Sequence, residues 1–281
     1  MNPNILDKLQ TPCIVIDLEK VNENLKEMQE TADSYNCKLR PHIKTHKMVP
    51  FAKLQLKYGA AGITCAKVSE AEVMASGGID DIFIAYPLIG DFRIKRAIKL
   101  TEKVSRLILA VDSLEGAAAL NEAARDAGIC FEVRLEVDTG AKRTGVLREK
   151  ALFIAKEINQ MSNLNLTGIY TFKSLVYQGK STTDPEIAGQ EEGELMKQIS
   201  EDMEVAGINL TDISAGSTPT GLSVAQTGKV TEIRPGTYIF KDYMLYKEGI
   251  TKLEDVAAHI YATVVSTPTE EYAVIDGGTK T

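Results

Sequence analysis

The chain has 281 residues, of which 44% are hydrophobic and 25% charged, as in an ordinary soluble globular protein. Its 32 basic and 39 acidic residues give a net charge of −7, and the dispersed basic residues argue against a nucleic-acid or anionic-membrane surface. The four cysteines have no paired spacing, no signal peptide precedes them, and no apolar run approaches the ~20 residues that cross a bilayer. We therefore expect a soluble cytoplasmic protein with reduced thiols.

Short β-rich runs alternate with longer amphipathic segments along most of the chain. The expected strands cover residues 13–16, 37–41, 62–66, 82–86, 106–111, 130–137, 166–172, 211–215 and 230–234. The expected helices cover residues 18–35, 69–78, 92–104, 114–128, 148–161 and 185–205. This alternation predicts βαβ units and a parallel sheet. Eight strands follow residue 36, and eight repeats close a (β/α)8 TIM barrel, so the first strand must pair elsewhere.

The last part of the sequence changes character after Pro235. Strands expected at 237–240, 259–266 and 272–275 have no helices between them, which predicts a second, mostly β domain with antiparallel strands. So few strands cannot bury a core alone. We therefore expect a barrel over residues 18–240, and a β domain from residues 1–17 and 241–281 that is incomplete because the chain is shortened.

The first segment with unusual chemistry is Arg40-Pro-His-Ile-Lys-Thr-His-Lys47, at the end of the first barrel strand. Reactive groups of such barrels gather at the carboxyl ends of the strands. Most lysines are surface cations, but Lys44 lies between His42 and His46. Neighbouring cations and partial burial lower a lysine's pKa and free its neutral amine as a nucleophile. The histidines have two other interpretations: hydrogen bonds to local groups, or a His-x3-His metal site without a Cys or carboxylate in the segment.

Two segments rich in glycine and hydroxyl groups follow barrel strands seven and eight. Ser214-Ala-Gly-Ser-Thr-Pro-Thr-Gly221 offers backbone N–H groups and hydroxyls, and barrels of this kind often bind phosphate after these strands. Such a stretch is by itself typical of a loop, so its position carries the prediction. In Glu232-Ile-Arg-Pro-Gly-Thr-Tyr238, Gly236 lets the backbone approach a ligand closely.

A third segment, Glu136-Val-Asp-Thr-Gly-Ala-Lys-Arg-Thr-Gly-Val146, follows strand five. With Asp138, Gly140 and Arg143 it presents charge at the barrel mouth. A surface loop that leads into a helix would have a similar composition. Arg143 can meet either an anion or a heterocyclic nitrogen.

Together these motifs resemble the D-threonine aldolase and D-serine dehydratase family of fold-type III pyridoxal 5'-phosphate (PLP) enzymes, which share the alanine racemase N-terminal barrel. The resemblance runs from about Thr11 to the end of the chain. Its motifs, in the expected order, are Arg40-Pro-His-Ile-Lys-Thr-His-Lys47, Ala66-Lys-Val-Ser-Glu-Ala-Glu72, Asp138-Thr-Gly-Ala-Lys-Arg-Thr-Gly145, Ser214-Ala-Gly-Ser-Thr-Pro219 and Arg234-Pro-Gly-Thr-Tyr238.

The resemblance implies roles for individual residues. Lys44 matches the lysine that forms the internal aldimine, and Arg143 matches the arginine that faces the cofactor ring. Tyr170 and Tyr177 fall where the family places tyrosines near the cofactor, although Thr171-Phe-Lys-Ser174 lacks the His-containing loop of many members. The residues that match the phosphate-binding segments are Gly216, Ser217, Thr218, Gly236 and Tyr238.

The sequence departs from the family in its metal ligands. Aldolases and dehydratases of this kind bind a divalent metal (Mn, Mg or Zn) through a late His-x-Cys or His-x-Asp pair. This chain has three histidines, His42, His46 and His259, and no such pair before Thr281. The family ligands would lie beyond Thr281, and we expect little metal-dependent turnover from residues 1–281 alone.

The resemblance implies a PLP-dependent lyase that acts on β-hydroxy-D-amino acids, either by retro-aldol cleavage to glycine and an aldehyde or by elimination. An amino-acid racemase is an alternative, and it would need a base on each face of the substrate. A PLP-binding protein without turnover is a third. The expected partners are a small D-amino acid and a second copy of the chain, because related enzymes build their sites between two subunits. No nucleic-acid or membrane partner is expected.

Overall fold

The computed structural model describes residues 8–278, so residues 1–7 and 279–281 of the expected β domain lie outside it. The chain forms two compact units. The larger unit is Glu27–Thr237, and the smaller one combines Met1–Lys26 with Tyr238–Thr281. No helix among the described residues is long and apolar enough to span a membrane.

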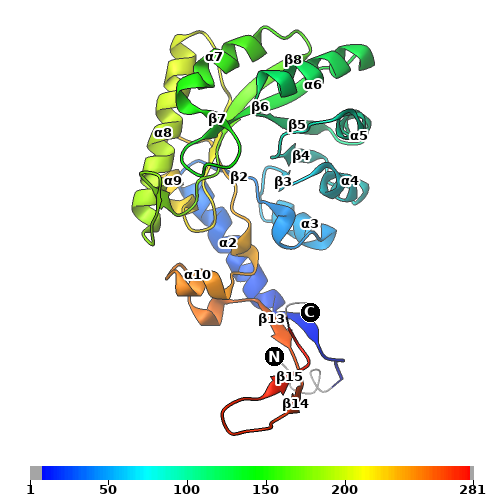
Figure 1. Cartoon of the computed structure of the whole chain (residues 1–281), viewed down its shortest axis with the longest axis vertical. Coiled ribbons are helices and arrows are strands. Elements are labelled where there is room, and N and C mark those ends of the chain that lie inside the picture. Colours follow the sequence, from blue (N-terminus) through cyan, green and yellow to red (C-terminus); the bar gives the residue numbers. More distant parts are fainter. Residues whose placement is uncertain (1–7, 279–281) are drawn as a thin grey trace. The chain divides into compact units, whose positions relative to one another are not determined.

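The larger unit is a parallel β-barrel (Figure 1). Its strands are β2 (Lys38–Leu39), β3 (Ile63–Cys65), β4 (Asp81–Ile84), β5 (Arg106–Val111), β6 (Phe131–Asp138), β8 (Leu164–Tyr170), β11 (Asp212–Ala215) and β12 (Glu232–Ile233). Each of these strands pairs in parallel with its neighbours, in the order β2-β12-β11-β8-β6-β5-β4-β3. A parallel bridge between His42 and Thr64 joins the two ends of this order. The predicted (β/α)8 barrel is therefore confirmed.

Helices connect the barrel strands and lie outside them (Figure 1). They are α2 (Leu18–Ser34), α3 (Val49–Lys57), α4 (Val68–Ser76), α5 (Asp91–Thr101), α6 (Leu114–Ala127), α7 (Arg148–Asn159), α8 (Pro185–Val205) and α9 (Gly221–Gln226). Local signals set their ends: Ser113 Oγ caps α6, and Gly128, with φ +67°, ends it. Each barrel strand is buried on both faces, by the surrounding helices on one side and by side chains of the barrel interior on the other. This burial accounts for largely apolar strands such as Arg106–Val111.

The structure corrects several details of the expected element order. Residues 237–240 are not a strand, because β12 already pairs with β11 and β2 and the closed barrel leaves no edge there; Thr237–Ile239 forms a short 3-10 helix instead. The strand expected at 259–266 divides into β13 (Ala258–Tyr261) and β14 (Val264–Ser266). Helix α3 was not expected, although Pro50 lies in its first turn, where proline costs no helical hydrogen bond.

Charged side chains fill part of the barrel interior. Glu232 accepts hydrogen bonds from Arg40 Nε at 2.7 Å, from Arg134 Nη1 at 2.6 Å and from Ser214 Oγ at 2.6 Å. All four residues are buried. An apolar cluster completes the interior and consists of Phe83, Ile108, Ala110 and Tyr170. The barrel is thus a packed core, and its ligand-binding groups must lie at a strand end.

The smaller unit contains two pairs of antiparallel strands. β1 (Cys13–Ile16) pairs with β13, and β14 pairs with β15 (Val274–Ile275). The unit also contains α10 (Tyr243–Lys247), which was not expected from the sequence. Two-stranded sheets bury little apolar surface by themselves, and Ile14 and Ile260, paired across β1 and β13, are both more than half exposed.

Candidate cofactor site

Lys44 lies in a single 3-10 turn, Ile43–Thr45, directly after β2 at the carboxyl end of the barrel. His42 holds this turn at both sides. Its Nδ1 accepts a hydrogen bond from the Lys44 N–H at 3.4 Å, and its own N–H donates to the Pro235 carbonyl at 2.9 Å. Ile43 is fully buried, so the turn is anchored, while the Lys44 side chain is partly open to solvent.

The surroundings of Lys44 favour its neutral amine. Partial burial of the amine lowers the pKa of Lys44, and the positive charges of Arg143 and Arg234 lower it further, whereas Glu70 acts in the opposite direction. Burial, followed by the positive charges of Lys44 and Arg234, also lowers the pKa of His42 well below its usual value. A neutral amine is the nucleophilic form of a lysine, and the role of Lys44 as such a nucleophile stays a prediction.

The side chains of Arg143 and Lys44 both lie against the aromatic ring of Phe172. The Lys44 Nζ lies 5.4 Å from the centre of the Phe172 ring, and the Arg143 guanidinium carbon lies 4.9 Å from it. Arg143 also lies 4.0 Å from the buried carboxylate of Glu136. Phe172 and Glu136 were not predicted as site residues. A phenylalanine at the carboxyl end of the sixth barrel strand was the available signal.

Asp138 shapes the loop that carries Arg143. Its Oδ1 accepts hydrogen bonds from the N–H groups of Gly140 at 2.8 Å and Lys142 at 3.1 Å. Its carboxylate is therefore engaged by the backbone of its own loop. Of the charges expected at the barrel mouth, Arg143 is the one that contacts Phe172 beside Lys44.

The predicted phosphate segment after β11 forms a tight turn. Gly216 has φ +83°, a conformation that favours glycine, and its N–H donates to Glu192 Oε1 at 3.2 Å. Ser217 donates its N–H to Thr220 Oγ1 at 3.0 Å. Thr218 Oγ1 accepts the Gly236 N–H at 3.3 Å. This hydrogen bond joins the segments after strands seven and eight, and their binding of a phosphate stays a prediction.

Gly236 also joins the phosphate segments to the lysine turn. A side-chain carbon built on Gly236 would lie 3.1 Å from Thr45 Oγ1 and 3.2 Å from the His42 carbonyl oxygen. Thr45 follows Lys44 directly. Gly236 therefore approaches the lysine turn closely, and its approach to a ligand stays a prediction.

The three predicted tyrosines differ in their surroundings. Tyr170 is buried inside the barrel, and its hydroxyl donates to Glu136 Oε2 at 2.8 Å. Tyr177 lies half-buried on β9 (Val176–Tyr177), which pairs with β10 (Lys180–Ser181). Tyr238 is buried in the 3-10 turn at which the smaller unit resumes. Their contact with a cofactor stays a prediction.

Arg234 is a buried cation of the site that the sequence did not single out. Its guanidinium donates to Ser214 Oγ at 2.5 Å and to the Thr171 carbonyl, and it lies 5.1 Å from the centre of the Tyr170 ring. Its charge contributes to the lowered pKa of Lys44. The residue belongs to the Arg234-Pro-Gly motif, so the motif itself was the available signal.

Replacing Arg143 with glutamine is expected to raise the pKa of Lys44 toward its usual value, because the nearest cation on Phe172 is removed. The measurement is the pH dependence with which an amine-acylating reagent modifies Lys44, followed by peptide mass spectrometry. Arg148→Gln is the matched control, since Arg148 contacts exposed Gln198 instead. An unchanged midpoint in Arg143→Gln would contradict the electrostatic account.

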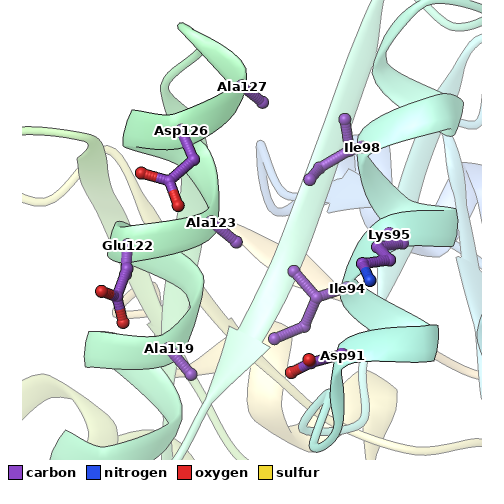
Figure 2. A pocket seen from close by; sticks show the side chains of 9 residues that line it. All are labelled: Asp91, Ile94, Lys95, Ile98, Ala119, Glu122, Ala123, Asp126 and Ala127. Carbon is purple, nitrogen blue, oxygen red and sulfur yellow. The ribbon is translucent and has the colours of Figure 1, made fainter.

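No group of three or more His, Cys, Asp or Glu residues within residues 8–278 is placed to hold a metal ion. A cavity of about 440 Å³ lies between α5 and α6, on the outside of the barrel (Figure 2). Ile94, Ile98 and three alanines of α6 line it, together with charged side chains at its edge. None of the predicted site residues is among its lining residues.

Comparison with known proteins places the chain in a family. Residues 16–244 match the alanine racemase N-terminal domain family. The chain is 34% identical to D-threo-3-hydroxyaspartate dehydratase of Delftia sp. (strain HT23), over 96% of this chain and 72% of the relative. It is 29% identical to D-threonine aldolase of Arthrobacter sp, over 98% of this chain and 73% of the relative.

A solved structure supports the same assignment. The crystal structure of D-threonine aldolase from Filomicrobium marinum matches with a TM-score of 0.88 and 28% identity, over 96% of this chain and 73% of that one. The resemblance seen in the sequence motifs is thereby confirmed. The chain belongs to the alanine racemase N-terminal domain family, and its relatives include a D-threo-3-hydroxyaspartate dehydratase and a D-threonine aldolase.

Proposed function

We propose that the protein is a PLP-dependent lyase of β-hydroxy-D-amino acids, with Lys44 as the residue that carries the cofactor. The observation that supports this most directly is that three predicted segments lie together at the carboxyl end of the barrel. They are the lysine turn, the loop that carries Arg143 and the turn after β11. There Lys44, whose pKa is lowered, lies against Phe172 together with Arg143, and Gly236 joins the lysine turn to the hydroxyl-rich turn after β11. The names of the relatives, a dehydratase and an aldolase, support the reaction class.

The residues present fit PLP. An amine with a lowered pKa suits the aldehyde of the cofactor, and the hydroxyls and N–H groups around Ser217, Thr218 and Gly236 suit its phosphate. Arg143 would face the cofactor ring. An arginine beside the pyridine nitrogen would keep that nitrogen unprotonated. When bound, PLP supplies the electron sink for bond cleavage next to the substrate nitrogen.

The chain's own groups bind, orient and carry protons. Lys44 Nζ lies 5.4 Å from the centre of the Phe172 ring, and with its lowered pKa it would accept a proton from a bound substrate and return it. Phe172 offers a flat apolar surface against which both Lys44 and Arg143 lie. Glu136 is fixed by hydrogen bonds from Tyr170 and Thr144, and it in turn orients Arg143. Burial raises the pKa of Glu136, while these hydrogen bonds oppose that effect.

The test is the visible absorbance of the PLP-loaded protein. D-Threonine is expected to change the spectrum, and L-threonine is expected to leave it unchanged. None of the three histidines of residues 1–281 belongs to a His-x-Cys or His-x-Asp pair that would bind the metal. We therefore expect little glycine release from D-threonine and manganese, and the decisive readout is the spectrum. A spectrum that neither enantiomer changes would favour the non-catalytic PLP-binding alternative. Racemisation that a chelator does not affect would favour the racemase.

We also propose a homodimer in which part of one subunit lies beside Lys44 of the other. The support is the pair of exposed isoleucines, Ile14 and Ile260, that face each other across the two-stranded sheet of β1 and β13. Sedimentation is expected to give twice the mass of the chain, and Ile14→Lys is expected to weaken association. Val205→Lys is the control, since Val205 is 91% exposed on α8. A monomeric wild-type protein would refute the proposal.

A further inference from the structure

Glu192 is a buried carboxyl group beside the predicted phosphate segment. It lies in α8 and is 0% exposed. The helix backbone reaches α9 here because two glycines share this face: a side-chain carbon on Gly189 would lie 2.7 Å from Ser223 Cβ, and one on Gly193 would lie 2.7 Å from Thr227. This close packing brings Glu192 against the turn that follows β11.

The carboxyl group of Glu192 holds both ends of that turn. Its Oε1 accepts the Gly216 N–H and its Oε2 accepts the Thr220 hydroxyl, each at 3.2 Å. Thr220 Oγ1 in turn accepts the Ser217 N–H. Burial raises the pKa of Glu192, and its hydrogen bond from Gly216 and the charge of Arg234 act in the opposite direction.

These contacts change the expected role of Gly216. The sequence analysis counted Gly216 among the residues that bind the phosphate, yet its N–H already donates to Glu192. Gly216 has φ +83°, in a region of backbone conformation that glycine enters freely. Because glycine also adopts other conformations easily, a contact such as the hydrogen bond to Glu192 is needed to fix the turn. Buried polar groups of this kind are costly to leave unpaired.

We propose that Glu192 is a positioning residue for the cofactor phosphate. Through Gly216 and Thr220 it fixes the turn that presents Ser217 and Thr218 to the phosphate, without touching the phosphate itself. This inference rests on the proposed PLP-binding function. It predicts that the loss of Glu192 weakens the recognition of the phosphate and spares the reaction of Lys44 with the aldehyde.

The test compares the dissociation constants of PLP and pyridoxal, which lacks the phosphate, for the wild-type apoprotein and its variants. Glu192→Leu is expected to reduce the preference for PLP about tenfold, with pyridoxal binding unchanged, because the Gly216 and Thr220 donors lose their acceptor. Glu192→Gln keeps an acceptor and should recover most of the preference. Glu194→Gln, exposed on the same helix, is the control.

Thr220→Val removes the same hydroxyl contact and serves if Glu192→Leu does not fold; the preference for PLP should fall there too. An equal loss of PLP and pyridoxal affinity would show a merely structural role and overturn the inference. An unchanged preference would overturn it as well, while leaving the proposed function intact. If the wild-type protein captures neither compound at Lys44, the proposed function fails, and this inference fails with it.

Discussion

Lys44→Ala is expected to abolish covalent capture of PLP and to lower any turnover at least about 10³-fold, as removal of a residue that forms a covalent bond usually does. The reason lies in the site. Lys44 is the amine in contact with Phe172, and its pKa is lowered by burial and by two nearby arginines. The stability of the apoprotein should change little, because the buried Ile43, and not the partly exposed Lys44, anchors the turn.

The measurement is reduction with borohydride followed by peptide mapping. In the wild-type protein the cofactor should be fixed to the peptide that contains Lys44. Lys47→Gln is the matched control: it removes an amine three residues away, whose contact is an ion pair with Glu70 at 3.5 Å, and it should bind PLP normally. If Lys44→Ala retains reducible cofactor on Lys47 or another lysine, the assignment is wrong.

The barrel was predictable because each strand is buried on both faces and therefore appears as a short apolar run between helices. Arg106–Val111 and Phe131–Asp138 are examples, and their bounds agree with the expected ones to within a residue. The ends of the barrel order were less predictable. The strands β2 and β12 are shorter than expected and comprise only Lys38–Leu39 and Glu232–Ile233. In both cases the chain leaves the sheet early and forms a turn of the candidate site.

The site was predictable only where a strand end marked it. Lys44 and Gly236 follow strands, and their motifs are local in sequence. Phe172, Arg234 and Glu192 were missed, because what defines them is contact with residues distant in the chain: Phe172 with Lys44, Arg234 with Thr171, and Glu192 with Gly216. A local pattern cannot show such a contact, since the closed barrel creates it.

The interior charges allow a prediction on stability. Glu232→Gln is expected to lower the free energy of unfolding by about 3–5 kcal/mol, because it leaves Arg40 and Arg134 buried without their shared carboxylate. Both arginines have side chains no more than 1% exposed, and Arg134 Nε has no hydrogen-bond partner within the described part of the chain. Solvent therefore cannot compensate for the lost charge.

Urea unfolding of the PLP-free protein measures the effect. The control is Glu122→Gln on α6, whose pair with Arg125 is more than half exposed on both sides and should contribute at most about 1 kcal/mol. If the two variants lose similar stability, the buried network contributes no more than a surface pair, and the prediction is wrong.

The pH dependence of the difference follows from the pKa of Glu232. Burial raises this pKa, but the charges of Arg134 and Arg40 outweigh burial and hold it below its usual range. A carboxyl group with a depressed pKa stabilises the fold fully above its unfolded pKa, about 4.3, and the contribution is lost as the pH falls toward the folded value. The stability difference between wild type and Glu232→Gln should therefore be constant from pH 7 to pH 5 and shrink below about pH 4. A difference that stays constant down to pH 3 would show that the carboxylate charge is not what stabilises the barrel interior.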